Sequence, residues 1–191
     1  GTILVLTGLV GTFGTEALAG FGIGSRVEFL MIPLIFGIGT AMTSIVGANI
    51  GANNIERAET VGIYGGSLAG VVSVFIGLTL ALFPDLWIQY FTDDPKASAV
   101  TTMYIQLVGP FYVFQGIGLS LYFASQGANA MKWPTIATIA RFLIASIGGS
   151  IAIYWLGLGI ESIFLSSSIA MMVFGLTIFI SIKRGAWRKT S

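Results

Sequence analysis

The chain has 191 residues, of which 55% are hydrophobic and only 9% are charged, and its formal net charge is +1. Soluble domains have about 25% charged residues, so this chain could not cover a water-facing surface, and lipid is the solvent that fits it. The small net charge excludes a general attraction to nucleic acid. Cysteine and histidine are absent, which excludes disulfides, thiolate metal sites and histidine-based catalytic triads. Any proton-linked chemistry must therefore use carboxylates.

The chain begins in an apolar stretch, residues 1–15, that is long enough for only part of a membrane span. A complete span needs about 20 predominantly apolar residues, and five later stretches reach or approach that length. We therefore predict an all-α, polytopic transmembrane bundle in which residues 1–191 form one six-helix lobe with its first helix truncated. The predicted spans are 1–15 (partial), 17–48, 59–83, 98–124, 134–157 and 161–182.

The start of the chain also bears on its completeness. Gly1 is not a starting methionine, and no basic segment precedes the first apolar stretch, as it would in a signal peptide. We therefore expect the chain to be a fragment of a longer protein.

Short connectors with turn-forming residues separate the predicted spans, so consecutive helices should pack antiparallel. Lysine and arginine in such connectors favour the cytoplasmic side. Arg26 and Lys96 lie on or near one side of the membrane, whereas most basic residues fall on the other: Arg57, Lys132, Lys183, Arg184, Arg188 and Lys189. This distribution predicts a multi-pass protein of the inner (plasma) membrane with a cytoplasmic C-terminus.

Glycine and proline recur at specific places inside the spans. Gly62, Gly66 and Gly70 form a GxxxG face on the third span, which lets another helix approach closely. We interpret this face as packing within the lobe in preference to a homodimer seam. Pro33 and Pro110 interrupt the second and fourth spans, where proline frees a carbonyl and kinks the helix. Transporters use such broken helices as binding sites or hinges.

Ionisable side chains inside a membrane are costly and usually functional, and the sequence places Arg26, Glu28 and Arg141 there. A second helix that starts at Glu16 puts Glu28 about 18 Å along its axis, where it could face a cavity. A start near Arg26 leaves both groups at the membrane rim, reaching toward water. Glu28 and Arg26 are candidates for binding an ion or substrate, and we interpret Arg141 as an interfacial anchor.

Amides and aromatic rings gather on the fourth span, which supplies the other candidate binding residues. Gln106, Tyr112 and Gln115, with Tyr104 nearby, are side chains of the kind that bind bulky amphipathic ligands. Glutamine can equally link helices to one another. The tryptophans fall near span ends and indicate an aromatic belt at the membrane surface: Trp87, Trp133, Trp155 and Trp187.

Several segments resemble the multidrug and toxic compound extrusion (MATE) family. The first region comprises residues 17–23 (ALAGFGI), 46–52 (VGANIGA) and 56–58 (ERA), and the second runs from SQGA at 125–128 to Pro134. The run of glycine, asparagine and alanine at 47–58 is the most specific part, because such a run is uncommon between hydrophobic helices. Together these segments extend over most of the chain.

The resemblance implies an architecture and an activity. MATE members have twelve helices in two six-helix lobes, and they export small organic, often cationic, drugs or metabolites in exchange for sodium ions or protons. This chain looks like the C-terminal lobe. Its implied partners are the missing N-terminal lobe, a small-molecule substrate and the lipid bilayer, and the coupling ion is the only cofactor. Some members carry a cation-binding acid at or near the position of Gln115, but glutamine cannot exchange a proton, so the coupling ion stays open.

Other functions are weighed against export. A lipid-linked oligosaccharide or lipid flippase must hold phosphate with several basic residues, yet only Arg26 and Arg141 lie in the predicted spans. A membrane scaffold without transport needs no prolines, glutamines or charges in its spans. Enzyme activity is not expected, because no nucleophile–base pair or metal-ligand cluster is visible. We therefore expect an antiporter that works by alternating access between two lobes.

Overall fold

The computed structural model describes residues 1–188, and this part of the chain contains helices and no strand. The elements are, in chain order, α1 (Thr2–Gly11), α2 (Thr15–Gly51), α3 (Ile55–Leu82), α4 (Asp85–Ile88), α5 (Pro95–Val108), the 3-10 turn η1 (Gly109–Phe111), α6 (Tyr112–Gly127), α7 (Lys132–Leu143), the π-helical turn η2 (Ile144–Gly148), α8 (Gly149–Tyr154) and α9 (Ile160–Lys183).

Five helical segments of the described chain are long and apolar enough to cross a membrane. Two of them combine several elements: Pro95–Gly127 comprises α5, η1 and α6, and Lys132–Tyr154 comprises α7, η2 and α8. The other three are α2, α3 and α9, and α1 is a shorter apolar helix. The predicted all-α, polytopic membrane bundle is confirmed.

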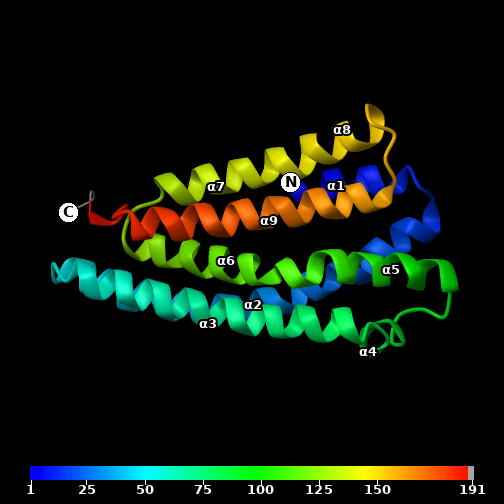
Figure 1. Ribbon diagram of the computed structural model, residues 1–191. Coiled ribbons are helices and arrows are strands. Elements are labelled where there is room, and N and C mark those ends of the chain that lie inside the picture. The colour runs from blue at the N-terminus through cyan, green and yellow to red at the C-terminus, as the bar shows by residue number, and fades with distance from the viewer. Residues whose placement is uncertain (189–191) are drawn as a thin grey trace.

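The long helices run side by side, with their connectors at two opposite ends of the bundle (Figure 1). One end holds the α2–α3 and α6–α7 turns and the last described residues, so the basic positions Arg57, Lys132 and Arg188 belong to the same end. The other end holds the α1–α2 and α8–α9 connectors and α4. Consecutive spans are therefore antiparallel. Lys189 lies outside the described residues.

Local sequence explains how α5 begins. The Asp94 carboxylate accepts hydrogen bonds from the backbone N–H groups of Lys96, at 3.1 Å, and Ala97, at 3.4 Å. Pro95 occupies the first helical position, where its missing N–H costs nothing. This cap sets the start of the helix that carries Tyr104 into the bundle.

Pro33 and Pro110, the two prolines predicted to interrupt spans, have different effects on their helices. Pro33 lies inside α2, which continues through it from Thr15 to Gly51. Pro110 lies in η1, the 3-10 turn that divides α5 from α6. The fourth span is thus interrupted at its proline, whereas the second span remains one helix.

The glycine face of α3 is covered by other parts of the same lobe. A Cβ atom added at Gly62 would lie 2.6 Å from the Trp187 ring, and one at Gly70 would lie 2.8 Å from Ile117 on α6. At Gly66, the nearest atom belongs to Leu121 of α6, at 3.0 Å. The face therefore lets α6 and the C-terminal segment pack closely against α3.

Trp187 is an interior residue, which corrects its assignment to an aromatic belt. Its side chain is only 1% exposed, and its indole N–H donates a hydrogen bond of 3.3 Å to the Ser125 hydroxyl. The ring fills the space above Gly62, where any larger residue would exclude it. Residues 184–188 therefore turn back toward the bundle, and Trp187 fills one end of it.

Candidate ion and substrate site

Glu28 lies deep in the lobe. Because α2 begins at Thr15, Glu28 is about 20 Å along the helix axis, and the residue is only 7% exposed. The sequence allowed the second helix to start at Glu16 or near Arg26. The structure agrees with the first alternative, in which Glu28 lies well inside the helix. The binding of an ion or substrate by Glu28 stays a prediction.

Tyr104 of α5 holds the Glu28 carboxylate. Its hydroxyl donates a hydrogen bond to Glu28 Oε1. The Tyr104 ring packs edge-on against Phe21, with 5.5 Å between centroids, and against Phe164 of α9, with 5.1 Å. Gly24 leaves the space that the ring occupies, since a Cβ there would lie 2.5 Å from Tyr104 Cδ1. The carboxylate is thus fixed by one hydrogen bond inside an aromatic cluster.

Tyr112 and Gln115 carry buried polar atoms for which the described residues provide no hydrogen-bond partner. Both side chains are buried on α6, three residues apart and so on one helix face. The Tyr112 hydroxyl lies within electrostatic range of Glu28 and Tyr104, but it makes no hydrogen bond of acceptable geometry. The Gln115 Oε1 atom also lacks a partner among the described residues. An unpaired buried polar atom costs about 1–3 kcal/mol, so these two atoms are candidates for contact with a ligand, an ion or water.

Arg141 belongs to the surroundings of Glu28. Its guanidinium lies over the Phe174 ring of α9, 5.3 Å from the centroid. Its positive charge also acts on the Glu28 carboxylate, although the structure contains no ion pair between them. Arg141 therefore contributes a counter-charge inside the lobe as well as any anchoring at the membrane interface.

The other predicted binding residues lie elsewhere. Arg26 is exposed, and its guanidinium lies over the Phe91 ring at 5.3 Å, in the connector between α4 and α5. Gln106 is also exposed, and its amide N–H donates to the Ala81 carbonyl of α3 at 3.5 Å. The structure thus brings Tyr112 close to Glu28 and places Gln115 on the same face of α6 as Tyr112. Arg26 and Gln106 are exposed and contact other residues.

Sequence reasoning missed a second buried acid, Glu59 on α3, which is 9% exposed. Arg188 donates two hydrogen bonds to its carboxylate, of 3.0 Å and 2.8 Å. Glu59 raises the pKa of Arg188 through these bonds and its charge. The burial of Glu59 was not predicted because the residue lies at the start of a predicted span, where a charged side chain normally reaches water. The Glu59–Arg188 pair links α3 to the segment that follows α9, at one end of the bundle.

The fold and the buried carboxylate place this chain among polytopic α-helical membrane proteins. More particularly, the chain belongs to the MatE family, whose model matches residues 3–151. Members of this family are transporters and not enzymes.

Curated relatives are named for drug resistance. The chain is 30% identical over 145 residues to the probable multidrug resistance protein NorM of Thermotoga maritima, covering 76% of this chain and 31% of that protein. It is 25% identical over 180 residues to the probable multidrug resistance protein YpnP of Bacillus subtilis, covering 91% and 40% respectively. The chain therefore spans well under half of the length of these relatives.

Solved structures share the fold of the whole chain. One is described as the outward-facing conformation of a multidrug resistance MATE family transporter of the MOP superfamily, with a TM-score of 0.87 and 24% identity. The match covers 98% of this chain and 43% of that one. The resemblance to a single MATE lobe, first seen in the sequence motifs, is thus confirmed at the level of fold.

Proposed function

We propose that this chain is the C-terminal lobe of a transporter that exports small organic, often cationic, molecules in exchange for sodium ions or protons. Alternating access between this lobe and an N-terminal lobe would carry the substrate across the inner (plasma) membrane, with the C-terminus in the cytoplasm. The multidrug resistance names of the relatives support drug export. The greater length of the solved relatives supports a second lobe.

The observation that supports this proposal is the buried Glu28 carboxylate close to Tyr112, on the α6 face that also carries Gln115. The Tyr112 hydroxyl and Gln115 Oε1 have no hydrogen-bond partner among the described residues. In a site shielded from water, a carboxylate attracts a cation more strongly than it does in solution. The Tyr112 hydroxyl and the Gln115 carbonyl can both turn an oxygen toward that cation. Tyr104 keeps the carboxylate in place as the cation enters or leaves.

Either coupling ion can use this arrangement. Sodium would be held by the Glu28 carboxylate together with neutral oxygens. A proton would be taken up by Glu28 itself, because the chain has no histidine. The flippase alternative needs basic residues for a phosphate group, and Arg26 lies away from the site, over Phe91. Arg141 is the basic residue whose charge acts on Glu28, and a single arginine close to a carboxylate makes a poor phosphate site. Export of cations therefore suits the site better.

The test is Glu28→Gln in the full-length gene product, expressed in a host that lacks its own drug pumps. The amide keeps the shape of the side chain and removes its charge, so we expect resistance to ethidium, an organic cation, to fall about ten-fold or more, equivalent to about 1.4 kcal/mol. The matched control is Glu161→Gln, which removes an exposed acid at the start of α9.

Expression of each variant is checked by immunoblotting of the membrane fraction. Parental resistance in Glu28→Gln at equal expression would contradict the role of Glu28. The polar face of α6, with Tyr112 and Gln115, would then be the better candidate site.

A further inference from the structure

The wide turn η2 contains a buried hydroxyl group, that of Ser146, with no hydrogen-bond partner among residues 1–188. Neighbouring hydroxyls bond to the carbonyl four residues earlier: Thr138 to Pro134 at 2.8 Å and Ser150 to Ser146 at 2.7 Å. The Ser146 hydroxyl makes no such bond, and the residue is only 9% exposed. A π-helical turn displaces the carbonyls from their α-helical positions, and such turns are frequent at functional sites.

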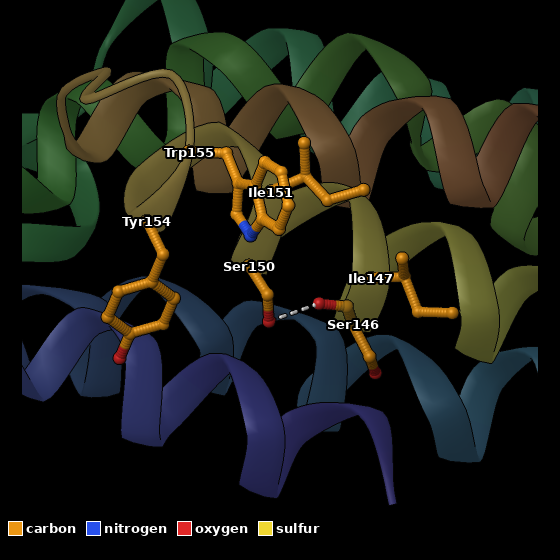
Figure 2. A pocket seen from close by; sticks show the side chains of 6 residues that line it. All are labelled: Ser146, Ile147, Ser150, Ile151, Tyr154 and Trp155. Carbon is orange, nitrogen blue, oxygen red and sulfur yellow. Dashed lines mark hydrogen bonds between the residues drawn. The ribbon is translucent and has the colours of Figure 1, made fainter.

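Ser146 lies beside a hollow of about 250 Å³. The residues that line the hollow are Ser146, Ile147, Ser150, Ile151, Tyr154 and Trp155. Figure 2 shows the Ser146 hydroxyl directed away from η2 toward the blue helices, with Tyr154 reaching to the same side and the Trp155 ring above. Tyr154 is 66% exposed and Trp155 is 86% exposed. The hollow thus has two accessible aromatic rings and one unpaired hydroxyl.

The neighbouring helix α1 bounds this region. Gly149, directly after η2, faces α1, and a Cβ added there would lie 3.1 Å from Leu9. None of the lining residues belongs to α2, α5 or α6, which carry Glu28, Tyr104, Tyr112 and Gln115. The hollow is therefore a separate place from the site around Glu28.

We propose that this hollow binds a planar aromatic group that carries a hydrogen-bond acceptor. The isoleucines provide apolar walls, Tyr154 and Trp155 offer rings for stacking, and the Ser146 hydroxyl donates to the acceptor. None of the described residues that line the hollow is charged. Arg141 precedes Ser146 by five residues, or about 7.5 Å along the helix, so a positive charge on the bound group is disfavoured.

The size of the hollow limits what it takes. Sites for drug-sized ligands usually measure about 300–1,000 Å³, so a hollow of 250 Å³ accepts a small ring system and not a whole bulky molecule. We infer that it holds the aromatic part of an exported amphipath. The identification of the ligand as an exported molecule rests on the proposed export function. Binding of an aromatic ring in the hollow does not depend on it.

Two probes of the same tricyclic shape test the proposal. Acridone has a ring carbonyl that can accept a hydrogen bond, and anthracene has none. Each is titrated by its own fluorescence into the purified full-length gene product in lipid nanodiscs, with empty nanodiscs as the baseline. We expect the parent protein to bind acridone more tightly than anthracene.

The variants separate the hydroxyl from the rings. Ser146→Ala should weaken acridone binding about five-fold and leave anthracene binding unchanged, as expected for the loss of one hydrogen bond. Ser150→Ala is the matched control, because its hydroxyl already bonds to the Ser146 carbonyl. Trp155→Leu should weaken binding of both probes, whereas Trp133→Leu, at the opposite end of this span, should weaken neither.

Separate measurements test the aromatic site and the proposed export. Equal acridone affinity in Ser146→Ala and the parent, or an equal loss in Ser150→Ala, overturns the aromatic site and leaves export through Glu28 unaffected. Ethidium export is measured separately in vesicles. Absence of export alongside Ser146-dependent acridone binding overturns the export function and supports the site.

Discussion

Replacing Gly175 by alanine tests the contact between α9 and α6, because the two backbones meet there. A Cβ atom at Gly175 would lie 2.5 Å from the Phe114 carbonyl oxygen and 3.0 Å from both its carbonyl carbon and its Cα. All three atoms are backbone, so no side chain can rotate away. Heavy atoms in contact settle at about 3.5 Å, so α9 must move outward by about 1 Å.

The expected effect is a net loss of about 2 kcal/mol in the free energy of unfolding. Overpacking against a rigid backbone costs up to about 3 kcal/mol, and alanine recovers about 1 kcal/mol over glycine in a helix. The matched control is Gly37→Ala in α2, where a Cβ atom meets nothing within 4 Å. That variant should be more stable than the parent by about 1 kcal/mol.

The assay is thermal unfolding of the purified protein in detergent, followed by tryptophan fluorescence. For a chain of this size, about 2 kcal/mol corresponds to a fall of about 4–8 °C in Tm, and the control should rise by about 2–4 °C. A Tm for Gly175→Ala at or above that of Gly37→Ala would refute the close approach of α6 and α9.

Two further predictions concern the ends of the bundle. This chain has no cysteine, so single cysteines can be introduced into it once any cysteine elsewhere in the full-length product has been replaced. In intact cells, a cysteine at Asn53 should react only with membrane-permeant reagents, whereas one at Lys96 should react with impermeant ones. Labelling of position 53 by an impermeant reagent would contradict this topology. Arg188→Ala should lower Tm more than Glu59→Gln, because it leaves a buried carboxylate without its two hydrogen bonds. If both variants had the Tm of the parent, the pair would not stabilise this end of the bundle.

The sequence was sufficient for the course of the chain through the membrane. Long apolar runs with short polar connectors specify helices and their order, because an unpaired backbone is too costly in lipid. The repeat of Gly62, Gly66 and Gly70 indicated close packing, and the structure places α6 and Trp187 over these residues. Family motifs between the spans indicated the lobe to which they belong, and the family is confirmed.

The sequence did not predict which side of each helix faces the interior of the bundle. In a membrane bundle, both the inner and the lipid-facing sides are apolar, so hydropathy does not reveal which side faces inward. Gln106 and Gln115 therefore looked equivalent, although the first is exposed and the second is 5% exposed. Glu59 and Trp187 posed a related problem, because their burial depends on chain that folds back after α9. The widened turn at Ser146 has no distinctive local sequence.

The length of α2 has a mechanical consequence. At about 1.5 Å per residue its 37 residues extend over about 55 Å, more than the roughly 40–45 Å of a bilayer with its headgroups. Pro33 stands at its midpoint, so each arm is about 27 Å long. Proline removes one backbone hydrogen bond there and makes bending easier. A bend of about 10° would swing the tip of one arm by roughly 5 Å, close to the pitch of one helical turn. A bend at Pro33 would therefore make α2 act as a lever, with its pivot five residues from Glu28.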